Sequence, residues 1–148
     1  MSEKAYEKHV WMVLLVVGVL LMVSSTAPFY ESIAGPPDPE PLLGVSWEEL
    51  QASNPGVALL ISFLFRIYGY AWLGFGFFVT AVSLKSYRHG ERWAWYTLWI
   101  LPVVQGLWVA TALSVGDAGL RDAITFTVPL ILSLIGLLLP YRKFFPRK

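Results

Sequence analysis

The chain contains no cysteine and only two histidines among its 148 residues. Without cysteine there can be no disulfide, no thiolate nucleophile and no Cys-ligated zinc or iron–sulfur site. His9 and His89 both lie at the ends of hydrophobic stretches, so they are not placed to bracket a haem in mid-membrane. The sequence therefore predicts neither a metal site nor a cofactor.

Charged side chains are also scarce, at 14% of the residues, and the formal net charge is only +1. This charge is too small to indicate a nucleic-acid partner. No carboxylate lies within a hydrophobic stretch, and no Ser, His and acid converge at one depth, so no general acid or base can be named. We predict no catalytic residue and disfavour an enzyme. A lipid-modifying membrane enzyme is the least favoured of the functional classes considered.

What the sequence does have is hydrophobic length, with 56% hydrophobic residues. A helix needs about 20 apolar residues to cross a bilayer, and four such stretches are present. They predict an all-α integral membrane bundle forming one domain, 1–148, with an outer loop at 31–54. The expected transmembrane helices span residues 10–30, 55–84, 93–113 and 121–139.

Helix boundaries are marked by capping residues. Ser46 followed by Glu49 is a capping-box pattern and predicts a short helix from Trp47. Asn54 before Pro55 predicts an N-cap and first helical residue for the second span. Pro102 removes a backbone donor and is expected to kink the third span. The segment VGDAGL is expected to form the turn before the fourth.

The distribution of Lys and Arg sets the orientation, because basic residues near span ends stay on the cytoplasmic side. Of the Lys and Arg residues near span ends, only Arg121 falls on the predicted outer face, which carries the acidic loop. We therefore expect both termini to be cytoplasmic, in a prokaryotic plasma membrane. The residues of the basic face are Lys4, Lys8, Lys85, Arg88, Arg92, Arg142, Lys143, Arg147 and Lys148.

Arg66 is the one charged residue in the interior of a predicted span, away from its ends, and an intramembrane charge indicates a candidate functional site. It lies 19 residues before Lys85, about 28 Å along a helix and close to the outer edge of the core. It either reaches the outer headgroups or pairs with Asp122, Glu48 or Glu49, or it binds a ligand or a lipid phosphate.

A possible binding pocket between the second and third spans has Arg66, Tyr70, Trp99 and Gln105 as its candidate ligand-binding residues. The simpler interpretation is packing. Gln105 would then form a hydrogen bond between helices, and three glycines of the second span would supply small surfaces on which another helix can approach closely. These glycines are Gly69, Gly74 and Gly76.

The fourth span carries small or weakly polar residues at spacings of three and four, which predicts a seam between helices. The residues of this stripe are Thr125, Pro129, Ser133 and Gly136. At the inner surface, basic and aromatic residues in KSYRHGERW and YRKFFPRK predict anchoring to anionic headgroups. Docking of a cytoplasmic partner is the alternative for these segments.

The run YRHGERWAWYTLW and the loop PFYESIAGPPDPEPLLGVSWEELQASNPG resemble patterns in small uncharacterised prokaryotic membrane proteins with four helices. A looser similarity to DoxX-like proteins rests on helix number and loop length. The resemblance implies a four-helix membrane fold and carries no site residues.

These observations favour a non-enzymatic membrane protein that acts through helix packing, as an accessory or assembly subunit or as a homo-oligomer. Its expected partners are membrane lipids and other membrane chains or copies of itself. The alternative is a binder or carrier of a lipid or apolar small molecule.

Overall fold

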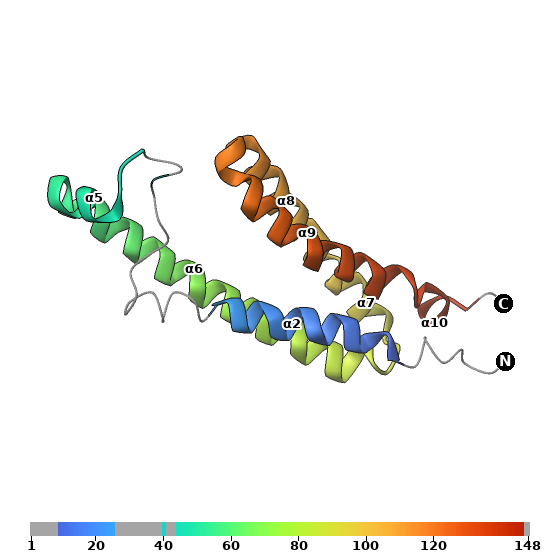
Figure 1. The fold of residues 1–148 in the computed structure, drawn as a ribbon. Coiled ribbons are helices and arrows are strands. Elements are labelled where there is room, and N and C mark those ends of the chain that lie inside the picture. The colour runs from blue at the N-terminus through green and yellow to red at the C-terminus, as the bar shows by residue number, and fades with distance from the viewer. Residues whose placement is uncertain (1–8, 26–39, 41–43, 147–148) are drawn as a thin grey trace. The chain divides into compact units, whose positions relative to one another are not determined.

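The computed structural model describes residues 9–25, 40 and 44–146, except for the side chains of Ala118, Arg121 and Asp122. Every regular element in this part of the chain is helical (Figure 1). The chain divides into two compact units, which are considered separately. Unit 1 is Met1–Leu20 with Gly76–Lys148, and unit 2 is Leu21–Phe75.

The helices follow the apolar stretches of the sequence. A π-helical turn, Ser83–Tyr87, extends α6, and two stretches, Pro55–Tyr87 and Arg92–Ser114, are long and apolar enough to cross a membrane. The helices are α2 (Trp11–Ser25), α5 (Trp47–Ser53), α6 (Pro55–Val82), α7 (Arg92–Leu98), α8 (Ile100–Ser114), α9 (Asp117–Leu138) and α10 (Tyr141–Phe144).

The all-helical class is confirmed, and the predicted capping is found where α5 and α6 begin. The Ser46 hydroxyl accepts a hydrogen bond from the Glu49 N–H at 3.2 Å, and Asn54 Oδ1 accepts one from the Val57 N–H at 3.4 Å. Pro55 is the first residue of α6. Each cap supplies an acceptor to an N–H that has no partner inside its helix. Half of the predicted outer loop, residues 31–39 and 41–43, and residues 26–30 of the first predicted span lie outside the described residues.

The third apolar stretch is interrupted at Trp99, between α7 and α8. Pro102 has no N–H to offer the Leu98 carbonyl one turn earlier, so the regular bonding stops just before the proline. The Trp99 N–H bonds to the Tyr96 carbonyl, three residues back, at 3.3 Å, whereas in a regular α-helix it would bond four residues back.

The turn between α8 and α9 is shorter than the predicted VGDAGL segment, because α9 begins at Asp117 rather than at Arg121. Gly116 has φ 74° and ends α8 in the left-handed region that glycine tolerates. A Cβ at Gly119 would overlap the Ala112 carbonyl, so glycine lets the two helices meet immediately after the turn. The result is a tight antiparallel hairpin of α8 and α9 (Figure 1).

In unit 1, glycines bring α2 close to both α6 and α9. A Cβ built on Gly18 would lie 2.6 Å from Thr80 Oγ1, and one on Gly136 would lie 2.7 Å from Leu14 Cδ2. Small residues allow such close backbone approach between helices. Around these contacts lie fully buried apolar side chains, namely Leu14, Val17, Val79, Leu98, Leu101 and Leu137.

Candidate functional site

Arg66 and Tyr70 lie one turn apart on the part of α6 that belongs to unit 2. Both side chains are exposed, and Tyr70 exposes 55% of its surface. Neither Glu48 nor Glu49, the described acids considered as partners in the sequence analysis, forms an ion pair with Arg66. The Asp122 side chain lies outside the described set.

Trp99 and Gln105 belong to unit 1. The Trp99 ring packs edge-on against Trp95, with 5.6 Å between centroids, and its indole nitrogen is buried without an acceptor in the described part of the chain. Gln105 is completely buried, and its Oε1 lies 2.9 Å from the hydroxyl of Ser133 on α9. The structure thus joins Gln105 to Ser133, a residue of the predicted seam, and confirms its predicted hydrogen bond between helices.

The single proton of the Ser133 hydroxyl decides how this pair is bonded. The hydroxyl oxygen lies 2.7 Å from the Pro129 carbonyl and 2.9 Å from Gln105 Oε1, yet it can donate to only one of them. A half-turn of the Gln105 amide lets its otherwise unpartnered Nε2 donate to Ser133 while Ser133 donates to Pro129. In this arrangement the Ser133 hydroxyl and Gln105 Nε2 each donate one hydrogen bond within the helix pair.

The predicted seam on α9 is confirmed over its second half. Ser133 and Gly136 are buried, Pro129 is half-buried and Thr125 is exposed. Gly136 meets Leu14 of α2, so this end of α9 packs against both α8 and α2.

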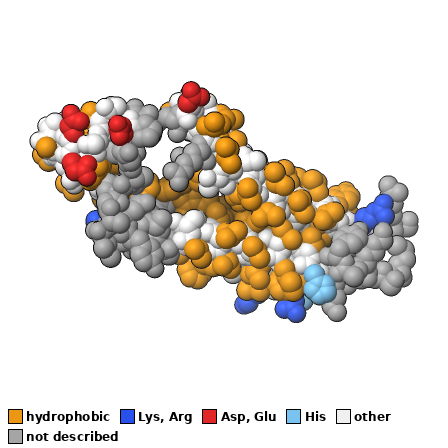
Figure 2. Space-filling view, viewed as in Figure 1, with side chains coloured by type: hydrophobic (Ala, Val, Ile, Leu, Met, Phe, Trp, Pro, Cys, Tyr) orange, Lys and Arg blue, Asp and Glu red, His pale blue; other side chains and the backbone are white. Residues whose placement is uncertain are grey.

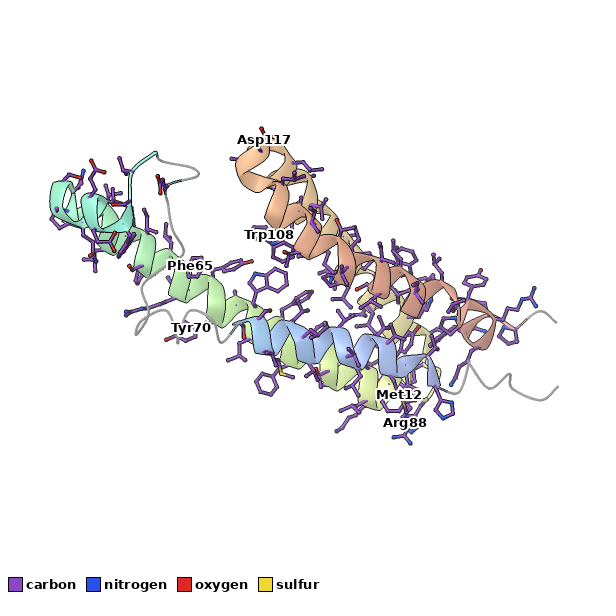
Figure 3. All side chains as sticks on the ribbon, viewed as in Figure 1. Met12, Phe65, Tyr70, Arg88, Trp108 and Asp117 are labelled. Atoms are coloured by element: carbon purple, nitrogen blue, oxygen red, sulfur yellow. The ribbon has the colours of Figure 1, made fainter. Side chains whose placement is uncertain are left out.

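The two sides of α6 differ sharply. One side carries a ladder of rings, in which Tyr68 and Trp72 lie 5.8 Å apart and Trp72 and Phe75 also lie 5.8 Å apart. Figure 3 shows Phe65, at the start of this ladder, and Tyr70 on opposite sides of the helix. The other side is a line of exposed residues, here called the α6 stripe: Phe63, Ile67, Tyr70, Gly74 and Phe77.

A second cluster of polar and aromatic side chains lies at the end of unit 1 where α9 ends, just before Pro140. A regular helix would pair the Gly136 carbonyl with the N–H of residue 140, but proline has none. The Tyr87 hydroxyl donates to that carbonyl instead, at 2.6 Å and in a buried environment. Trp95 Nε1 donates to the next carbonyl, that of Leu137, at 2.9 Å. Two aromatic side chains thus take the place of the missing backbone donors.

Two basic residues complete this connection between residues 87–95 and α10. Arg92 Nε donates to the Phe144 carbonyl at 3.0 Å, and Lys143 Nζ donates to the Arg88 carbonyl at 3.3 Å. We call the set of these four hydrogen bonds the C-terminal clamp. It joins residues 87–95 to residues 136–144.

The π-helical turn positions Tyr87 for the clamp. The N–H groups of Arg88 and Glu91 reach the carbonyls of Ser83 and Ser86, five residues back, at 3.1 Å each. The wider turn changes the direction in which the following side chains leave the helix axis. Tyr87 is almost completely buried and lies 4.7 Å from the Phe144 ring.

Aromatic rings pack around Trp95, one of the clamp residues. Trp95 contacts Tyr141 at 5.8 Å and Phe145 at 5.2 Å between centroids, and Tyr141 stacks on Phe145 at 5.0 Å. The guanidinium of Arg92 lies 5.5 Å from the Phe145 ring centre.

The sequence predicts these residues at the inner surface but does not predict the clamp. The available signal was Pro140 four residues after Gly136, because that spacing leaves a carbonyl that some side chain must satisfy. Within the described residues, no group of His, Cys, Asp and Glu could hold a metal ion. Comparisons with protein-family models, curated proteins and solved structures find no match to this chain.

Proposed function

We propose that this chain is a four-span integral membrane protein of a prokaryotic plasma membrane, with both termini in the cytoplasm. In this proposal it acts without catalysis, by packing against copies of itself or against other membrane chains. Two helical stretches have the required length and composition. The apolar part of α9, Ala123–Leu138, rises about 24 Å and the whole helix about 33 Å, against a core of about 30 Å. Within the first predicted span, residues 10–30, the structure describes α2, which runs to Ser25.

The observation that supports packing is the α6 stripe. Its residues follow one another at spacings of four, three, four and three, the repeat with which side chains of two helices interdigitate. Phe63 exposes 57% of its surface and Phe77 60%. A Cβ on Gly74, between Tyr70 and Phe77, would meet nothing within 4 Å. Large rings on either side of an open glycine offer a hollow for a side chain from another helix.

Disulfide cross-linking tests for a homo-oligomer directly, because the chain has no cysteine and a single introduced one reports only its own position. A single cysteine at Phe63, in native membranes under mild oxidation, is expected to give a disulfide-linked dimer on a non-reducing gel. Leu64→Cys is the matched control, because Leu64 is 55% exposed and Phe63 57%. The two side chains point about 100° apart around the helix.

A dimer from Phe63→Cys alone supports the α6 stripe as the contact between copies. Equal cross-linking of both variants indicates random collision and contradicts the proposal. If neither variant cross-links, gentle-detergent purification must yield another membrane chain; a lone monomer would rule out action by packing. Ligand binding by Arg66, Tyr70, Trp99 and Gln105 stays a prediction.

A further inference from the structure

The C-terminal clamp gathers positive charge at one end of unit 1. Lys143 and Arg88 are 55 residues apart in sequence, and Arg92 and Phe144 are 52 apart, yet each pair is joined by a hydrogen bond. Folding therefore brings the cations of two separate segments together. We call this group the basic end: Lys85, Arg88, Arg92, Arg142 and Lys143.

Among the described residues on either side of the clamp, carboxylates do little to neutralise the basic end. Glu91 is the one acidic side chain in residues 83–99 and 139–146, and it accepts a hydrogen bond from Trp93 Nε1. The Arg88 guanidinium lies 5.0 Å from the Trp11 ring centre, and Arg92 lies over Phe145. An aromatic face holds a guanidinium in place without cancelling its charge.

Amphipathic rings lie around these cations at the surface. Trp93 is 51% exposed, Tyr96 60% and Tyr141 50%. Figure 3 places Arg88 at the same end of unit 1 as Met12, at the start of α2, and Asp117 at the far end of the α8–α9 hairpin. Trp and Tyr with a polar tip favour the headgroup level of a bilayer. Cations and rings thus share one end of the unit, and an acid marks the other.

We propose that the basic end binds the headgroup phosphate of anionic phospholipids and selects them over zwitterionic ones. The inference rests on the proposed membrane insertion and adds a preferred lipid class to it. A guanidinium donates paired N–H groups to phosphate oxygens. A zwitterionic headgroup also has a phosphate, but its ammonium group is repelled by the clustered cations.

The test uses the full chain in vesicles of phosphatidylcholine with phosphatidylglycerol. Spin-labelled versions of the two lipids report the relative association of each with the protein by electron paramagnetic resonance. The wild type is expected to prefer phosphatidylglycerol, and Arg88→Gln to lower that preference about fivefold. Arg88 joins the clamp through its main-chain carbonyl, so this variant keeps the clamp hydrogen bonds. Arg88→Lys, which keeps the charge, is expected to retain most of the preference.

A matched control separates local from net charge. The Arg88→Gln/Glu48→Gln double variant has the wild-type net charge, and Glu48 is an exposed residue of α5 in unit 2. Its preference is expected to stay as low as that of Arg88→Gln. Full recovery would show a net-charge effect and overturn the proposal, as would a wild type without preference. If inorganic phosphate abolishes the preference and chloride at equal ionic strength does not, the site binds free anions and the lipid proposal fails.

The failure of this proposal can be told apart from the failure of membrane insertion. Wild-type protein that does not float with vesicles of pure phosphatidylcholine contradicts the proposed insertion itself. Protein that floats with those vesicles but shows no headgroup preference contradicts only the assignment of the basic end.

Discussion

At the scale of single residues, the Gly136 carbonyl shows how the chain tolerates a proline at the end of a helix. Pro140 cannot donate to it, and an unpaired carbonyl away from water is costly. Tyr87 supplies the donor from 49 residues earlier in the sequence. This one hydrogen bond therefore links a local backbone defect in α9 to the π-helical turn that follows α6.

Replacing Tyr87 with Phe is expected to destabilise unit 1 by about 1–3 kcal/mol, the cost of leaving a buried acceptor unsatisfied. The ring and its contact with Phe144 stay, so the change isolates the hydroxyl. Unfolding of the purified protein in detergent, followed by circular dichroism against denaturant or temperature, measures the loss.

Tyr141→Phe is the matched control for that experiment. Tyr141 is half exposed, and its hydroxyl forms no hydrogen bond with the described residues. Its removal is expected to change stability by less than about 0.5 kcal/mol. Equal losses from the two variants would contradict the role assigned to Tyr87.

At the scale of helices, close packing in unit 1 depends on where glycine lies. Gly18 on α2 meets Thr80 on α6, whereas a Cβ on Gly106 of α8 would meet nothing within 4 Å. Both glycines are inside helices, where alanine is intrinsically favoured by about 1 kcal/mol. The two sites therefore separate the packing cost of a methyl group from its effect on helix propensity.

Gly18→Ala is expected to destabilise the protein by about 1–3 kcal/mol, because the new methyl group pushes on the Thr80 main chain as well as its side chain. Its nearest contacts would be 2.6 Å to Thr80 Oγ1 and 3.0 Å to Thr80 N. Gly106→Ala is expected to be neutral or stabilising. The same unfolding measurement tests both, and a loss at Gly106 comparable to that at Gly18 would be evidence against the contact.

The helices were largely predictable from the sequence. Hydrophobic length located α6 and α9, and Ser46, Asn54 and Pro55 located helix starts because capping depends on neighbouring residues. The turn after α8 was predicted too long, since Gly119 looks like a loop residue until the carbonyl of Ala112 is placed beside it. The C-terminal clamp was not predicted, because its bonds join residues 42 to 55 apart.

At the scale of the whole molecule, charge is the clearest asymmetry. Acidic side chains (red in Figure 2) gather over α5 in unit 2. In unit 1 the Lys and Arg side chains that the structure describes lie around the C-terminal clamp, at the opposite end of the α8–α9 hairpin from Asp117. Basic residues beside membrane spans mark the cytoplasmic side, which supports the proposed orientation with both termini inside.

Single cysteines in the otherwise cysteine-free chain test that orientation in intact cells. Ser86→Cys and Pro146→Cys are expected to resist a membrane-impermeant maleimide until the cells are opened. Gln51→Cys, on the exposed surface of α5, is expected to react at once. Labelling of position 146 from the side opposite to position 86 would exclude the four-span topology.

The long separation between the partners of the clamp also has a consequence for biosynthesis. Until residues 136 and 137 have been synthesised, the Tyr87 hydroxyl and the Trp95 indole have no Gly136 or Leu137 carbonyl to bind. Those polar groups must then find water, lipid or a chaperone near the insertion machinery. Residues 87–95 therefore pass through a stage without these partners, which ends once α9 and α10 have been made, and slow elongation between residues 96 and 144 prolongs that stage.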